Sequence, residues 1–195
     1  MITWKEAQVR IAAGGTLTLE ELDQIIASSG GRTANESAQL FEACPEWVAQ
    51  RDAREAERLA KEERYLAEET PLREELHALG YPVKWVWDFV NTARSYPDAI
   101  PVLIDHLRRP YNDAVREGIA RALAVREARG LAGGAIVETL REKGLGKQLR
   151  WALANTLTVV ADRTNRDGIK AVLATEENKD VADRLKRALK TATKP

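Results

Sequence analysis

Ala-Val-Arg-Glu-Gly-Ile-Ala-Arg-Ala-Leu at residues 114–123 aligns with two later stretches of the chain. These are Gln-Leu-Arg-Trp-Ala-Leu-Ala-Asn-Thr-Leu at 148–157 and Asp-Val-Ala-Asp-Arg-Leu-Lys-Arg-Ala-Leu at 180–189. The apolar anchors Val115, Leu149 and Val181 lie 34 and 32 residues apart, and further apolar residues follow each anchor at intervals of four. Apolar residues at this interval share one face of an α-helix. The three stretches therefore predict one amphipathic helix repeated about every 33 residues.

A second apolar pattern precedes each of these helices. Ile100, Ile136 and Ile169 occupy equivalent positions ahead of the three anchors, which indicates a partner helix in each repeat. Two helices with narrow apolar faces cannot bury themselves alone, but stacked pairs form a continuous core. Strand patterns are nearly absent, and Ala, Leu, Glu and Arg dominate. We therefore expect an all-α protein.

Pro101-Val-Leu-Ile-Asp-His-Leu107, a polar turn and the pair Val115-Arg116 resemble a HEAT repeat, and Leu149-Arg150 repeats the pair. The resemblance covers residues 71–195. It implies a short HEAT-like α-α solenoid, a right-handed superhelix, with helix pairs at about 71–95, 97–125, 131–160 and 164–191. It implies no particular activity, because such solenoids are scaffolds with many roles.

Residues 1–70 form a separate N-terminal helical region. Thr3 with Glu6 and Thr18 with Glu21 have the spacing of capping boxes, which predicts a helix start at each threonine. Pro45 begins a long, very polar segment that is expected to be helical to about residue 69, since proline suits the first helical turn. Large apolar residues at coiled-coil spacing are missing from it, so a helix exposed to solvent is favoured over a coiled-coil arm.

Charge divides the chain unevenly. The 195 residues have a formal net charge of zero, but residues 1–81 sum to −7 and residues 82–195 to +7. This asymmetry is consistent with two halves that face each other, with a basic C-terminal half that faces an acidic partner, or with ordinary solvated helix surfaces in both halves. No apolar run is long enough to span a membrane, no secretory signal is evident, and Cys44 is the single cysteine. These features predict a cytoplasmic protein with no membrane partner.

Candidate binding residues follow from the resemblance, which implies that the second helices line a concave binding face. Residues two and six positions after each anchor point away from the core. With the equivalent positions of the opening pair, the candidates are Trp85, Asp88, Glu117, Arg121, Trp151, Asn155, Asp183 and Arg187. Exposed Trp and Arg residues often dominate binding energy. The alternative is that Trp85, Trp87 and Trp151 pack within the chain.

Sequence motifs for catalysis, metal binding or a cofactor are not found. His77 and His106 lack the spacing of metal ligands, and no phosphate-binding or dinucleotide-binding glycine loop is present. We therefore predict no catalytic residues, no metal and no cofactor.

Three functions remain open. The first is a non-enzymatic adaptor or an inhibitor of the immunity type, which binds another protein through the concave face. The second is nucleic-acid binding, including an alkyl-base DNA glycosylase, which the resemblance allows, with Trp85 and Trp151 around the lesion and Asp88 as the catalytic carboxylate. The third is a structural role, with self-association through helix 45–69. The sequence leaves the partner and the oligomeric state open.

Overall fold

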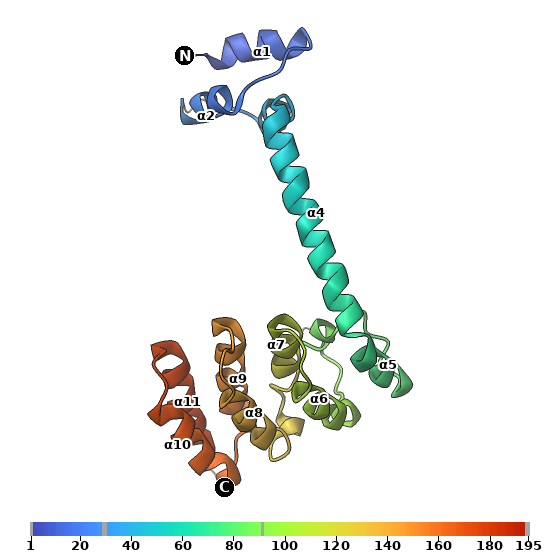
Figure 1. Cartoon of the computed structure of the whole chain (residues 1–195), viewed down its shortest axis with the longest axis vertical. Coiled ribbons are helices and arrows are strands. Elements are labelled where there is room, and N and C mark those ends of the chain that lie inside the picture. The colour runs from blue at the N-terminus through green and yellow to red at the C-terminus, as the bar shows by residue number, and fades with distance from the viewer. Residues whose placement is uncertain (1, 29–30, 91, 194–195) are drawn as a thin grey trace. The chain divides into compact units, whose positions relative to one another are not determined.

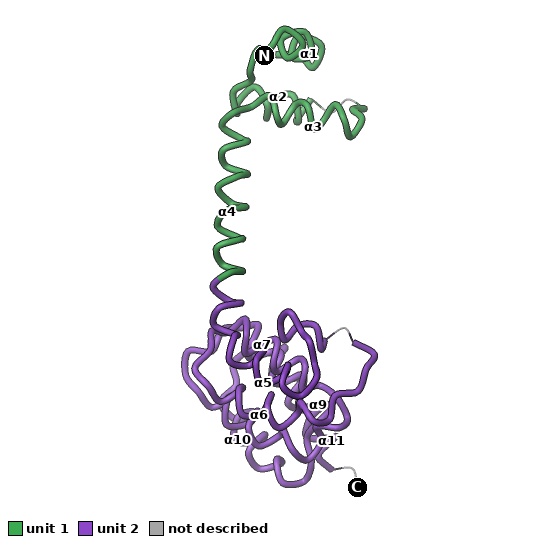
Figure 2. The backbone as a smooth tube through the Cα atoms, turned by 90° about the vertical axis from the view of Figure 1, so that its right-hand side faces the viewer, with its two compact units in different colours: residues 1–63 green, residues 64–195 purple. Residues whose placement is uncertain are grey.

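The computed structural model describes residues 2–28, 31–90 and 92–193, and these are helical without any β-strand. The all-α prediction is confirmed. The chain forms two compact units, residues 1–63 and 64–195 (Figure 2). Nowhere in the described ranges is a helix both long and apolar enough to cross a membrane.

The first unit contains three short helices, α1 (Trp4–Ala12), α2 (Leu19–Ala27) and α3 (Ala34–Glu42). Each begins at a threonine whose side chain accepts a hydrogen bond from the backbone of a glutamate three residues later, and that glutamate closes a capping box. The two predicted boxes are confirmed, and Thr33 with Glu36 forms a third. The small core of this unit consists of Ala7, Leu17, Leu22, Ile25, Leu40 and Cys44.

Helix α4 (Pro45–Glu68) begins in the first unit and ends in the second. None of its residues is buried. Arg58 pairs with Glu55 at 2.7 Å and with Glu62 at 3.1 Å, so the exposed surface is supported by pairs at helical spacing. The sequence predicted a boundary at residue 70, whereas the units divide between residues 63 and 64. The boundary is earlier because Tyr65 already packs against the core of the second unit.

The second unit arranges its helices in pairs. After α5 (Thr70–Ala78) come α6 (Ile100–Leu107) with α7 (Asp113–Ala122), α8 (Gly133–Leu140) with α9 (Lys147–Val160), and α10 (Arg166–Ala174) with α11 (Lys179–Thr191). Helices α7, α9 and α11 lie side by side in one layer, and α6, α8 and α10 form the other (Figure 1). One continuous core runs through the unit from Leu72 to Ala192.

Two buried or half-buried arginines join successive helix pairs in the same way. Arg116 on α7 donates to the last carbonyl of α6 and pairs with Glu142 at 2.7 Å. Arg150 on α9 donates to the last carbonyl of α8 and pairs with Glu176 at 2.8 Å. The arginines are 34 residues apart, and so are the glutamates. This equal spacing means that the contacts between pairs repeat along with the sequence pattern.

The opening pair differs from the expected one. Within the described part of residues 71–95, α5 is the only α-helix, and the 3₁₀ helix η1 (Val86–Phe89) follows it. Asp88 accepts hydrogen bonds from the backbone of Lys84 and Trp85, which holds the chain in a tight turn at this point. Pro82, this turn and η1 take the place of the expected second helix, and the chain continues to η2 (Pro97–Ala99) before α6.

Candidate interaction face

Four side chains alternate across the layer of α7, α9 and α11. Arg121 lies over two indoles, 5.6 Å from the ring centroid of Trp87 and 5.5 Å from that of Trp151. Arg184 lies 4.9 Å from the Trp151 centroid. Trp87, Arg121, Trp151 and Arg184 therefore form a continuous Trp/Arg ladder. Each of these distances is short enough for a cation–π attraction.

Arg121 is held in the middle of the ladder by Glu117, one helical turn earlier on α7. The Nη2–Oε1 distance is 2.8 Å, and the Glu117 side chain is largely buried. The carboxylate and the two indole faces fix the guanidinium in place. Arg121 is consequently a rigid element whose charge is already balanced.

Arg184 is different, because it has the indole but no carboxylate. Among the residues that the structure describes, no Asp or Glu lies within ion-pair distance of Arg184. Its guanidinium therefore stacks on Trp151 by one face and leaves its N–H edges available. Arg187 follows three residues later on α11 and is exposed. Asp180 lines the hollow beside Trp151 and Asp183 interacts with Arg187, but among the described residues Arg184 itself has no carboxylate partner.

Trp87 reaches the ladder because η1 packs directly on α7. A Cβ atom at Gly118 would lie 2.5 Å from Val86 Cγ1 and 2.8 Å from Trp87 Nε1, so only glycine permits this approach. Gly118 is itself buried. The position of the Trp87 ring therefore depends on the absence of a Cβ atom at residue 118.

The surface beside the ladder is hollowed at several points that adjoin one another. A hollow of about 380 Å³ lies between α7, α9 and α11 and is lined by Arg121, Lys147, Gln148, Trp151, Asn178 and Asp180. A second, of about 250 Å³, shares Arg121 with it and extends to Phe89, Arg94 and Tyr96. Arg121 therefore separates two neighbouring depressions.

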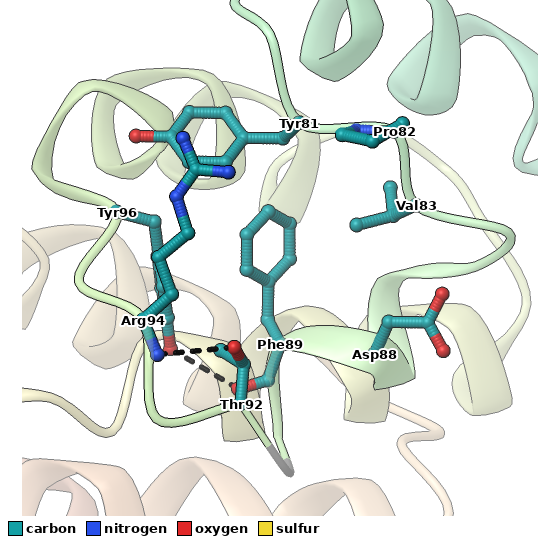
Figure 3. A pocket seen from close by; sticks show the side chains of 8 residues that line it. All are labelled: Tyr81, Pro82, Val83, Asp88, Phe89, Thr92, Arg94 and Tyr96. Carbon is teal, nitrogen blue, oxygen red and sulfur yellow. Dashed lines mark hydrogen bonds between the residues drawn. The ribbon is translucent and has the colours of Figure 1, made fainter.

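The third hollow, of about 160 Å³, shares Phe89, Arg94 and Tyr96 with the second and has aromatic walls. Figure 3 shows Phe89 pointing toward the ring of Tyr81, with the Arg94 side chain running beside it. The Tyr81 and Phe89 rings meet edge to face at 5.6 Å, and the Arg94 guanidinium lies 5.2 Å from the Tyr81 centroid. The Asp88 carboxylate points away from the Phe89 ring (Figure 3). Pro82, Val83 and the three aromatic residues line this hollow together with Asp88, Thr92 and Arg94.

The structure places the predicted site residues unequally. Glu117, Arg121 and Trp151 meet on one face, and Asn155 lies one turn beyond Trp151 and is half-buried. Asp183 pairs with Lys186 at 3.0 Å, and this hydrogen bond lowers the pKa of its carboxyl. Arg187 is exposed on the same helix.

Trp85 and Asp88 belong to the turn before α6 and not to a helix of the repeated layer. The Trp85 indole is 37% exposed and lies under the Lys84 ammonium, while Asp88 caps the backbone. The sequence favoured Trp85 at the outward position, but Trp87 is the ring that reaches Arg121. Arg184 was also missed, since it falls one position after the outward set. Arg184 follows Trp151 by 33 residues, about one repeat, and this offset was the available signal.

Other titratable groups in this unit have structural surroundings. His106 is buried, and burial lowers its pKa. Its Nδ1 atom lies 2.7 Å from the Tyr111 hydroxyl. Its Nε2 atom lies 3.0 Å from a Glu75 carboxylate oxygen, without the alignment of a hydrogen bond. Burial raises the pKa of Glu69 to about 7, although its carboxylate accepts a hydrogen bond from Val86. Within the described ranges no cluster of His, Cys, Asp and Glu could hold a metal ion.

Comparison of the chain with models of protein families, with curated proteins and with solved structures gives no match. The interpretation of this face therefore rests on its own geometry.

Proposed function

We propose that residues 71–195 are a short HEAT-like solenoid that binds another protein through the layer of α7, α9 and α11. The repeated Arg–Glu contacts support the HEAT-like architecture, since they recur with the same 34-residue offset as the sequence pattern. The opening repeat is incomplete, because its second helix is reduced to η1. On this proposal the protein is a non-enzymatic adaptor or inhibitor.

The observation that carries the proposal is the Trp/Arg ladder. Two indoles and two guanidiniums lie along η1 and the layer of α7, α9 and α11, beside adjoining hollows, and one of the two guanidiniums, Arg184, has no carboxylate partner among the described residues. Trp and Arg are the residues most enriched among those that dominate protein–protein binding energy. Their stacking also limits their freedom before binding, which reduces the entropy lost in a complex.

The test is an affinity capture from native lysate with the wild-type chain and two variants of equal charge change. Arg184→Glu alters the ladder, whereas Arg166→Glu alters the exposed first turn of α10, in the other layer. We expect a protein that is retained by the wild type and by Arg166→Glu and lost by Arg184→Glu. Identical capture by all three chains would contradict a binding role for this face.

Nucleic acid is the second candidate, because Arg and Trp also stack on bases. A nuclease-treated sample run in parallel separates the two, since nucleic-acid binding is lost with nuclease and falls steeply with salt. DNA glycosylase activity would require a carboxylate that points toward the bound base. Asp88 instead accepts hydrogen bonds from the backbone of Lys84 and Trp85, which favours the capping role.

A further inference from the structure

The positive charges on the proposed binding face that lack an ion-pair partner indicate the charge of the protein that binds there. Arg121 is balanced by Glu117, and Asp183 is balanced by Lys186, so these pairs contribute little net charge. Arg184 has no such carboxylate in the described part of the chain, and the exposed Arg187 and Lys147 lie on the same layer. An opposing surface that supplies carboxylates would neutralise what remains.

Arg184 is arranged for a carboxylate in particular. One face of its guanidinium is covered by the Trp151 indole at 4.9 Å, so a ligand approaches its edges. The edges of a guanidinium present paired N–H groups that match the two oxygens of a carboxylate. An uncharged or cationic segment would leave these donors without a charged acceptor.

The hollow farthest from Arg184 is lined in part by aromatic rings. The hollow at Tyr81, Phe89 and Tyr96 measures about 160 Å³, below the roughly 300 Å³ at which small-molecule sites begin. It is suited to one apolar side chain. It joins the ladder through the hollow that reaches Arg121. The three adjoining hollows, here called the groove, thus run from this recess past Arg121 to Trp151, on which the Arg184 guanidinium stacks.

We propose that this groove binds an extended acidic segment of a partner protein, with carboxylates on Arg184 and its basic neighbours and one apolar side chain in the Tyr81–Phe89 hollow. This inference rests on the proposed protein-binding function. Packed helices are about 9 Å apart, so α7 to α11 spans roughly 18 Å, or about six extended residues. A ten-residue peptide is long enough to cross the layer and reach the hollow.

The probe is a fluorescein-labelled decapeptide of four Glu and one Leu in a Gly background, made in both chain directions. Fluorescence anisotropy measures its affinity for the full-length chain. Matched probes replace the four Glu by Lys, replace the Leu by Gly, or are a ten-nucleotide oligothymidylate. Circular dichroism of each variant confirms that it is folded before titration.

We expect the acidic peptide to bind, the Lys peptide not to bind, and removal of the Leu to weaken binding several-fold. Arg184→Glu weakens binding at least tenfold and Arg184→Gln about threefold, whereas Arg166→Glu changes it less than twofold. Loss of one close charge contact accounts for effects of this size.

Three results overturn the inference. No binding of the acidic peptide up to about 1 mM excludes the chemistry. Equal weakening by Arg184→Glu and Arg166→Glu attributes binding to overall charge instead of the ladder. Tighter binding of oligothymidylate assigns the groove to nucleic acid. If the peptide fails while Arg184→Glu still loses a captured protein from lysate, the proposed function stands and only the acidic-partner inference is wrong.

Discussion

Gly118→Ala tests the contact that places Trp87 in the ladder. Gly118 lies inside α7, where alanine is favoured over glycine by about 1 kcal/mol. Against this gain stands the added Cβ, which would lie 2.5 Å from Val86 Cγ1 and 2.8 Å from Trp87 Nε1. Overpacking of a buried site costs about 1–3 kcal/mol. The expected net change is therefore a loss of about 0–2 kcal/mol in the free energy of unfolding.

Gly134→Ala is the matched control. Gly134 lies in α8, is exposed, and has no atom within 4 Å of an added Cβ. The same substitution there stabilises by about 0.4–1 kcal/mol, because it restricts the unfolded chain without a clash. The free energies of unfolding of the two variants should therefore differ by about 0.4–3 kcal/mol, with Gly134→Ala the more stable.

Differential scanning calorimetry measures the difference as a shift in Tm of the transition of residues 64–195, at about 3–5 °C per kcal/mol. Near-UV circular dichroism should also change in Gly118→Ala, since Trp87 must move, and stay unchanged in Gly134→Ala. Stabilisation of Gly118→Ala by as much as Gly134→Ala would refute the close packing of η1 on α7.

Three further predictions concern stability. The pKa of Glu69 is about 7 in the folded state and ordinarily 4.5, so the folded state binds more protons than the unfolded state between these pH values. The free energy of unfolding should therefore fall by up to about 3 kcal/mol as pH rises from 4.5 to 7. Glu69→Gln should remove this part of the pH dependence measured by urea titration, and the same pH dependence in the variant and the wild type would contradict it. Arg150→Met leaves the buried Glu176 carboxylate without its cation, though still with the hydrogen bond from the Asn178 N–H, and should cost about 3–5 kcal/mol. Arg116→Met leaves Glu142, which is 45% exposed, and should cost about 1–2 kcal/mol; equal costs in chemical denaturation would argue against this contrast. Thr33→Ala should destabilise residues 1–63 by about 1 kcal/mol through loss of the α3 cap, with unchanged melting of residues 64–195, and a shift in both transitions would be unexpected.

The local pattern of the sequence was enough to predict the capped N-terminal helices and the helices of the three repeats, but not η1 in the opening pair. Thr3 and Thr18 cap α1 and α2 through glutamates only three residues away, and Pro45 begins α4 as its geometry favours. Val115, Leu149 and Val181 are all buried. Caps and amphipathic faces depend on neighbours within about four residues, so they can be read from the chain directly. The layer that carries Glu117, Arg121 and Trp151 was predictable for the same reason.

Contacts between helix pairs required the tertiary structure. Arg116 and Arg150 each reach a glutamate 26 residues later, and nothing in the intervening sequence singles out that partner. Trp85 and Trp87 are equally good candidates in the sequence, but only the packing of η1 against Gly118 brings Trp87 to Arg121. The physical reason is that the stacking of helices decides which side chains meet, and stacking depends on the combined shape of surfaces that are distant in the chain.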